Sequence, residues 1–266
     1  MRRLAAAVVL TAAAGLLLAG SASAKTKTKT AHLGAVRATV TWTPVQFMQA
    51  KNVRLRIARS GRNVLDRRLG LSAPLRIRIK DLDGDDDPEV LVDLYTGGAH
   101  CCEFSLIYRY TGNSYSSLKH IWGDLTYHLN DLDHDGVLEL VSGDDRFAYS
   151  FTAYAGSAFP IQIWNYQAGK LRNVTRSYPA QIKQDSARLW KEHLQQRTGD
   201  FPDPRGILAA WMADEDLLGL QAQGWAKMQA LNRKGEFKGI GGDDLWPKNG
   251  AYLAKLRKFL KNHGYA

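Results

Sequence analysis

Two short acidic loops lie fifty residues apart in the sequence, and they constrain the fold more than any other feature. The first runs from Asp81 to Glu89 and the second from Asp131 to Glu139, and both place carboxylates at positions 1, 3, 5 and 9. Alternate residues of a tightly turned loop can direct their oxygens at one centre, and Ca²⁺ takes six to eight oxygen ligands at roughly 2.3 to 2.6 Å. The pattern therefore predicts two calcium-binding loops.

The predicted ligands are the residues at the odd positions of each loop. In the first loop they are Asp81, Asp83, Asp85, Asp87 and Glu89. In the second loop they are Asp131, Asp133, Asp135, Val137 and Glu139.

The residues around both loops alternate between apolar and polar, as strands with one buried face do. Each loop therefore has the pattern strand, calcium loop, strand. An EF-hand would instead have a helix on either side and a glutamate at position 12. Position 12 is Val92 in the first loop and Ser142 in the second, so the EF-hand interpretation is rejected.

The two loops resemble the FG-GAP or VCBS type of repeat, which is known from integrin α-subunit propellers and from many bacterial secreted proteins. Its mark is D-x-D-G-D-G followed by an acid and a strand, and the resemblance covers about the middle half of the chain. The first loop has Asp86 in place of the second family glycine, and the second has His134 in place of the first. Asp tolerates a left-handed backbone better than most residues.

A second periodic feature is a set of three hairpin patterns, each reversing at a glycine. They are Val53–Val64 with Gly61, Phe104–Tyr115 with Gly112, and Ile161–Arg172 with Gly169. The calcium loops fall between successive hairpins, which indicates a repeating four-stranded blade. About two and a half units are visible, whereas a closed propeller needs at least four. We therefore expect a mainly β domain of propeller-blade-like antiparallel repeats over residues 36–178.

After Thr175 the apolar residues recur at helical spacing, over Lys183–Gln196, Ile207–Leu231 and Ala251–Lys261. We expect an α-helical C-terminal unit over residues 179–266. Its tryptophans are expected to anchor the core of this unit.

The N-terminal 24 residues have the features of a secretory signal peptide. Arg2 and Arg3 precede an apolar stretch, and Ala22-Ser23-Ala24 supplies a small-residue cleavage site. Residues 25–35, which begin with a Lys/Thr repeat, are expected to form a flexible leader. No later stretch is apolar enough to span a membrane. The sequence therefore predicts a secreted or extracytoplasmic protein of bacterial type.

The two cysteines of the chain, Cys101 and Cys102, are adjacent. In an oxidising compartment the first interpretation is a disulfide between these neighbours. An intermolecular bridge and a soft-metal site that includes His100 are the two alternatives.

Each calcium loop is followed, after one strand, by a polar loop that contains glycine. If the protein has a ligand-facing surface, we expect these loops to form it. The candidate residues are Gly97, Gly98, His100, Asp144, Asp145 and Arg146.

The charge of the chain indicates which partners to expect. Without Arg2 and Arg3, the 36 lysines and arginines fall to 34, against 26 acidic residues, ten of which lie in the two loops. Calcium would neutralise the acidic loops and leave a cationic surface, which favours an anionic envelope polymer, an acidic polysaccharide or a lipid surface, and a protein is a further partner to consider. No nucleic-acid-binding motif is present, so nucleic acid is not expected. Self-association stays open.

Catalytic signatures are weak, because the sequence contains no G-x-S-x-G, H-E-x-x-H or G-x-x-x-x-G-K-[ST] motif. The favoured hypothesis is a secreted calcium-binding β-repeat protein that acts as a binding or structural module at the cell exterior. One alternative is an extracytoplasmic hydrolase that acts on envelope material. Another is a redox or metal-handling protein centred on the His100-Cys101-Cys102 turn.

Overall fold

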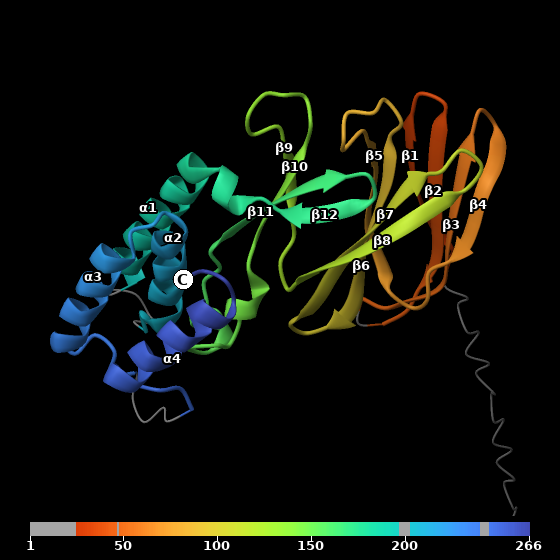
Figure 1. Cartoon of the computed structure of the whole chain (residues 1–266). Coiled ribbons are helices and arrows are strands. Elements are labelled where there is room, and N and C mark those ends of the chain that lie inside the picture. The colour runs from red at the N-terminus through yellow and green to blue at the C-terminus, as the bar shows by residue number, and fades with distance from the viewer. Residues whose placement is uncertain (1–24, 47, 197–202, 240–244) are drawn as a thin grey trace, which may run out of the picture.

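The computed structural model describes residues 25–46, 48–196, 203–239 and 245–266, apart from the side chain of Cys101. Within these residues the chain forms three four-stranded antiparallel sheets followed by four α-helices (Figure 1). The predicted signal peptide lies outside the described residues.

The three sheets follow one another along the chain, as consecutive repeats do. The first contains β1 (Lys27–Leu33), β2 (Val36–Pro44), β3 (Ala50–Arg59) and β4 (Arg62–Arg68). The second contains β5 (Ala73–Lys80), β6 (Glu89–Gly98), β7 (Cys101–Tyr110) and β8 (Tyr115–Gly123). The third contains β9 (His128–Asn130), β10 (Glu139–Gly143), β11 (Ile161–Gln167) and β12 (Lys170–Asn173).

The second sheet lies between the other two, and both of its faces are covered (Figure 1). One face packs Val90 and Val92 against Leu55 and other residues of the first sheet. The opposite face packs Leu91 in a cluster with Tyr166 of the third sheet. A strand covered on both sides has no face exposed to solvent, which explains why β6 begins with six consecutive buried residues. The sheets stack like neighbouring propeller blades, but they do not close into a ring.

The predicted mainly β class is therefore confirmed, and so are the three hairpins, which are β3–β4, β7–β8 and β11–β12. Gly61, Gly112 and Gly169 have φ values of 81°, 93° and 82°, which only glycine adopts without strain. The sequence suggested two and a half units because the first hairpin of the first sheet was not recognised.

The prediction of a flexible leader over residues 25–35 is wrong, because most of it is strand β1. All seven residues of β1 pair with β2 in an unbroken register. Thr30 and Thr39 share a hydrogen bond between their hydroxyls at 3.2 Å, and the ammonium of Lys29 donates to the backbone carbonyl of Leu75. Backbone pairing with an edge of the sheet orders a segment whose composition alone indicates disorder.

The helical unit contains α1 (Pro179–Gln196), α2 (Arg205–Leu217), α3 (Gln221–Arg233) and α4 (Asn249–Asn262). The predicted segment Ile207–Leu231 is two helices, separated where Gly219 takes a φ of 75°. Helix α2 is the centre of the unit, and its Trp211 is 2% exposed. None of the described helices is long and apolar enough to cross a bilayer.

Two short 3₁₀ turns, η1 (Asp145–Phe147) and η2 (Tyr154–Gly156), lie in the connection between β10 and β11, and a third, η3 (Thr175–Ser177), leads from β12 to α1. Phe147, which ends η1, and Phe151, which lies between η1 and η2, insert their rings into the helical core against Phe259. The β and helical parts are therefore joined by a shared apolar contact.

Candidate metal sites

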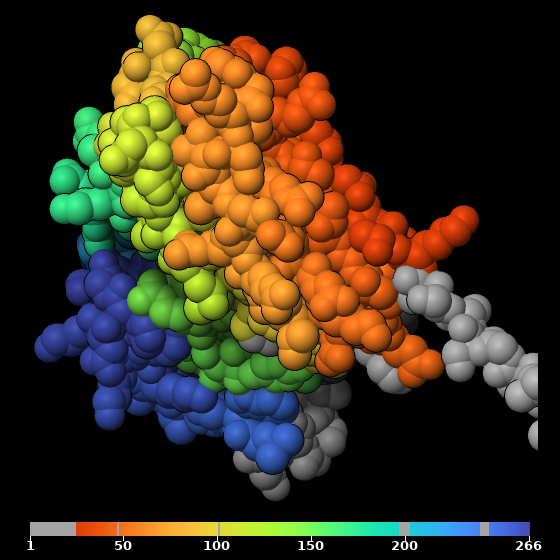
Figure 2. All heavy atoms as spheres, turned by 90° about the vertical axis from the view of Figure 1, so that its right-hand side faces the viewer, coloured from red at the N-terminus to blue at the C-terminus, as the bar shows by residue number. Residues whose placement is uncertain are grey.

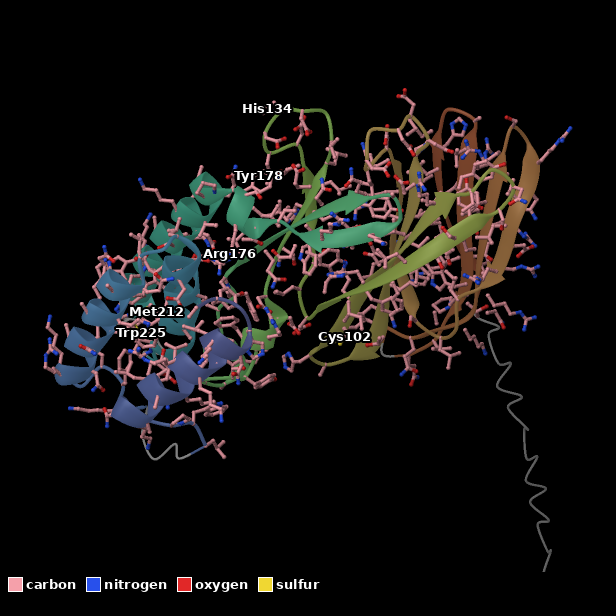
Figure 3. All side chains as sticks on the ribbon, viewed as in Figure 1. Cys102, His134, Arg176, Tyr178, Met212 and Trp225 are labelled. Atoms are coloured by element: carbon pink, nitrogen blue, oxygen red, sulfur yellow. The ribbon has the colours of Figure 1, made fainter. Side chains whose placement is uncertain are left out.

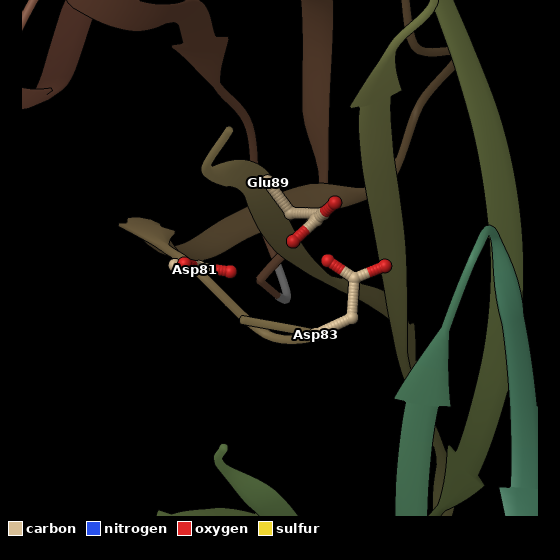
Figure 4. Close-up of side chains that lie close together, drawn as sticks. All are labelled: Asp81, Asp83 and Glu89. Carbon is tan, nitrogen blue, oxygen red and sulfur yellow. The ribbon is translucent and has the colours of Figure 1, made fainter. Parts of the chain in front are cut away.

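The first acidic loop connects β5 to β6 at one end of the second sheet. Asp81, Asp83 and Glu89 each place a carboxylate oxygen within 4.8 Å of the others. Figure 4 shows the three side chains converging on one point from the loop and from the start of β6. Three carboxylates around one centre provide the hard oxygen donors that Ca²⁺ takes.

Backbone hydrogen bonds hold the loop in this shape. The carboxylate of Asp81 accepts from the backbone N–H groups of Gly84 at 2.8 Å and Asp86 at 3.0 Å. Both donors have left-handed backbones, with φ values of 72° and 65°. Asp86 therefore has the left-handed backbone that Asp was expected to tolerate at this position. The loop turns tightly enough for Asp81 to face the start of β6.

Glu89 is the most unusual member of the group, because it is 0% exposed. Its Oε2 accepts from the backbone N–H of Leu82 at 3.1 Å. Its Oε1 and the Oδ1 of Asp83 are buried and have no hydrogen-bond partner in the described structure. Burial, followed by the neighbouring carboxylates, raises the pKa of Glu89 to about 8. Unpaired buried oxygens of this kind are unfavourable unless a cation compensates them.

The side chains of the other two predicted ligands in this loop bind arginines, and Arg109 also lies 4.0 Å from the carboxylate of Asp83. Asp85 forms an ion pair with Arg109 at 3.0 Å and also accepts from the backbone N–H of Asp87. Asp87 forms an ion pair with Arg59 at 2.6 Å. The structure thus groups three of the five predicted ligands of the first loop and directs the Asp87 carboxylate toward the first sheet.

The second loop connects β9 to β10 and repeats the arrangement. Asp131, Asp133 and Glu139 place carboxylate oxygens within 4.8 Å of one another. Glu139 is 1% exposed and accepts from the backbone N–H of Leu132 at 3.0 Å, just as Glu89 accepts from Leu82.

The turn of the second loop also follows the first. Asp131 accepts from the N–H groups of Asp135 and Gly136, both at 3.1 Å. His134 has a φ of 63°, so it adopts the left-handed backbone of the family glycine that it replaces. The side chain of Asp135 accepts from the N–H of Val137 at 2.8 Å, and Val137 has only a backbone carbonyl to offer a metal.

The two loops contact each other and the hairpin of the third sheet. A Cβ atom at Gly84 would lie 3.4 Å from the side chain of Val137, so the loops are in van der Waals contact. The N–H of Ala168, in the β11–β12 turn, donates to Asp83 at 2.9 Å. The buried hydroxyl of Tyr166 has no partner in the described structure, and burial and the nearby charge of Glu89 raise its pKa.

The second loop also contacts the beginning of the helical unit. The hydroxyl of Tyr178 donates to Asp133 at 3.2 Å, and Tyr178 immediately precedes α1. Figure 3 shows Tyr178 below the loop that carries His134. Sequence reasoning missed this residue, because nothing near Tyr178 indicates a partner 45 residues away.

The predicted ligand-facing loops meet around Asp124. The His100 ring lies 3.2 Å from the Asp124 carboxylate, and the Asp124 N–H donates to Asp145 at 3.0 Å. Asp144 binds the guanidinium of Arg146 through Nε at 2.8 Å. Asp144, Asp145 and Arg146 line a cavity of 540 Å³. Gly97 and Gly98 lie at the end of β6 that turns into β7, close in sequence to His100.

Cys102 also lines this cavity, and it is disulfide-bonded. Its backbone N–H donates to the hydroxyl of Thr96 at 2.8 Å. The side chain of Cys101, the other half of the predicted vicinal pair, lies outside the described residues. Elsewhere in the described structure, no third group of three His, Cys, Asp or Glu side chains has metal-binding spacing.

Comparison with known proteins finds one matching family model and two relatives. Residues 182–264, which span nearly all of α1 to α4, match the family described as the sll0997 C-terminal domain. The chain is 34% identical over 167 residues to the "Probable thylakoid lumen protein sll0997" of Synechocystis sp. PCC 6803, covering 60% of this chain and 49% of that protein. It is 29% identical over 140 residues to the "Uncharacterized protein y4bJ" of Sinorhizobium fredii, covering 52% and 22%.

The chain thus spans about half the length of the first relative and about a fifth of the second. No solved structure matches the chain.

Proposed function

We propose that this protein is an extracytoplasmic calcium-binding β-repeat protein that acts as a binding or structural module. The observation that carries the proposal is Glu89, whose carboxylate is fully buried and faces Asp81 and Asp83 with one oxygen unpaired. A buried carboxylate without a cationic or hydrogen-bonding partner is costly, whereas three convergent carboxylates are a typical calcium ligand set.

Two Ca²⁺ ions would act on the fold in this arrangement, one in each loop. Each ion would join a loop to the first residue of the strand that follows, because Glu89 begins β6 and Glu139 begins β10. The FG-GAP or VCBS resemblance supports the same chemistry, since it rests on these loops and their flanking strands. Calcium would therefore stabilise the folded state, by an amount that grows with the logarithm of the calcium concentration once this exceeds the dissociation constant.

A location outside the cytoplasm is supported by two independent observations. The N-terminal sequence has the pattern of a signal peptide. The Synechocystis relative is named as a probable thylakoid lumen protein, and the lumen is a compartment separate from the cytoplasm. Extracytoplasmic compartments often hold enough calcium for weak sites to be occupied.

The test is the thermal midpoint of the protein in excess EDTA and across a Ca²⁺ titration, with Mg²⁺ as the control ion. Calcium at 100 times its dissociation constant stabilises a protein by about 2.7 kcal/mol per site. For a chain of this size that corresponds to a rise of roughly 5 to 10 °C. A rise specific to calcium supports the proposal, and an unchanged midpoint refutes it for both loops.

A further inference from the structure

The outward face of the first sheet is rich in arginine and threonine. In β2 and β3 the inward side chains, such as Val40 and Leu55, are buried against the second sheet. The alternate side chains point away from it and are exposed or half-exposed. Figure 2 views the molecule from this side, where β1 to β4, red to orange, spread over the surface.

Most of the outward residues are basic or carry hydroxyls, with one acid among them, and the small apolar residue Ala58 stands in register with Arg37. The basic set contains His32 and four arginines, which are Arg37, Arg54, Arg56 and Arg68. The hydroxyl set contains Thr28, Thr30, Thr39 and Thr41. Asp66 is the acid. We call these ten residues the arginine–threonine face.

The strand register aligns these residues in rows across the sheet. One row joins Thr41, Arg54 and Arg68, and the next joins Thr39, Arg56 and Asp66. Because neighbouring strands are about 4.8 Å apart, each row offers a polar group at nearly regular intervals.

Asp66 neutralises only part of the positive charge. It accepts from the Nη2 of Arg54 at 2.7 Å and from the Nε of Arg56 at 3.1 Å. The hydrogen bond from Arg54 is the main cause that lowers the pKa of Asp66 to about 2. Arg37 and Arg68 form no ion pair within the described residues. Four arginines against one aspartate leave a net charge of +3 on the face.

A polar outer face is also what the end of a stack of repeats needs, because it prevents another sheet from adding. That role alone does not explain the arrangement, because a solubilising surface mixes both signs of charge. Arg54 lies directly opposite Arg68 in the register, and like charges in that position are unfavourable unless an anion compensates them. Asp66 compensates Arg54 within the face, whereas Arg68 has no acidic partner among the described residues and is open to an anionic ligand.

We propose that the arginine–threonine face binds a linear acidic polysaccharide. Guanidinium groups bind carboxylates and sulfates through two parallel hydrogen bonds, and threonine hydroxyls can bond sugar hydroxyls. The rows present these groups along a flat surface that a linear chain can follow. None of the residues belongs to a calcium loop, so the proposal goes beyond the calcium role and does not depend on it.

The same composition disfavours the other polyanions. The ten residues of the face include no aromatic or large aliphatic side chain, and the apolar residue beside them, Ala58, is small, whereas a membrane-surface segment buries an apolar face among the lipids. Single-stranded nucleic acid binds to aromatic side chains on which its bases stack. A polymer recognised by charge and hydroxyl groups alone fits the face better than either.

The test is binding to polygalacturonate, a carboxylated polysaccharide, over a series of salt concentrations. The variant Arg37→Ser/Arg68→Ser removes two cations that make no ion pair. The control Lys170→Ser/Arg172→Ser removes the same charge from β12, in the third sheet. We expect the first variant to weaken binding at least about tenfold and to lower the salt slope by one to two. The control should change affinity less than about twofold.

A third variant tests the face by a gain of binding, which misfolding cannot produce. Asp66→Asn releases Arg54 and Arg56 from their shared partner, and we expect it to tighten binding about threefold. Circular dichroism confirms that all variants are folded.

Three results would overturn the proposal. They are the absence of salt-dependent binding by the unmodified protein, equal weakening in the face variant and the β12 control, and tighter binding to phosphatidylglycerol vesicles than to polygalacturonate. All measurements are repeated in EDTA, so that a failure of the calcium proposal is seen separately from a failure of this one.

Discussion

The hydroxyl of Tyr178 donates a hydrogen bond to Oδ2 of Asp133 at 3.2 Å, across 45 residues of sequence. Asp133 belongs to the second candidate calcium site, and Tyr178 is the residue before α1. Burial and the carboxylates of Glu139 and Asp133 raise the pKa of the Tyr178 hydroxyl, so it stays a hydrogen-bond donor at neutral pH. The metal loop and the helical unit are therefore connected directly.

We predict that Tyr178→Phe reduces the effect of calcium on the helical unit without preventing binding. A hydrogen bond to a charged group contributes about 1.5 to 3 kcal/mol, and less where water competes. In the unmodified protein calcium should slow amide hydrogen exchange in both the loop and α1. In the variant the slowing in α1 should decrease several-fold, while the slowing in the loop persists.

The matched control is Tyr149→Phe, because the Tyr149 side chain is exposed and its hydroxyl makes no hydrogen bond in the described structure. Equal protection of α1 in all three proteins would show that the Tyr178 hydroxyl does not transmit the effect of calcium.

A second prediction uses glutamine in place of the two buried glutamates. Glutamine keeps the shape of the side chain and can still accept from the N–H of Leu82 or Leu132, but it removes the charge. In EDTA, Glu89→Gln should change the unfolding free energy by no more than about 1 kcal/mol. With calcium, Glu89→Gln should lose the stabilisation that calcium gives at the first loop. Glu139→Gln should lose the stabilisation that calcium gives at the second loop. Calorimetric titration should count two ions in the unmodified protein and one in each variant.

A purely structural glutamate gives a different pattern. In that case each variant would be destabilised by the same amount with and without calcium. The stabilisation that calcium gives would then be the same in the variants as in the unmodified protein.

A third prediction separates the ligands from the neighbouring acids of the first loop. Asp83 faces Asp81 and Glu89, whereas the Asp87 carboxylate binds Arg59. Asp83→Asn should weaken calcium binding at this site at least about tenfold, because a charged ligand is lost. Asp87→Asn should weaken it less than about threefold and cost up to about 1 kcal/mol of stability through the lost surface ion pair. A stronger effect of Asp87→Asn on calcium affinity would contradict the proposed ligand set of Asp81, Asp83 and Glu89.

The local geometry of the metal loops could be predicted from the sequence because it depends on nearby residues. Asp81 is oriented by N–H groups three and five positions later, and that spacing is visible in the sequence. The left-handed backbone of Asp86 follows from the tolerance of Asp for that region. The three hairpins could be predicted for the same reason, since each turn glycine lies between its own two strands.

The directions of Asp85 and Asp87 could not be predicted, because their arginine partners are 24 and 28 residues away. The spacing of the acids makes every odd position a candidate ligand. Only the stacked sheets show that Arg59 and Arg109 reach two of them. Strand β1 was missed for a related reason. Its lysines and threonines give no apolar face, and the pairing that orders it is provided by the backbone of β2.

Asp216 provides the last prediction, which concerns pH. This residue of α2 is 0% exposed, and neither carboxylate oxygen has a hydrogen-bond partner in the described structure. Burial raises its pKa from 3.8 to about 6. Between these values the folded state holds more protons than the unfolded state, so stability falls as the pH rises from about 4 to 6 and stays lower above that range. The charged carboxylate is therefore unfavourable for folding at neutral pH.

Asp216→Asn removes this charge, and we expect it to raise the unfolding free energy by about 2 to 3 kcal/mol at pH 8, because each pKa unit corresponds to about 1.4 kcal/mol. At pH 4 the native aspartate is already protonated, so the two proteins should be equally stable. Urea unfolding at both pH values, in EDTA to exclude metal effects, measures the difference. Glu192→Gln, on the exposed side of α1, should change stability by less than about 1 kcal/mol at either pH. A gain for Asp216→Asn that is the same at pH 4 and pH 8 would show that packing, and not the buried charge, distinguishes the two side chains.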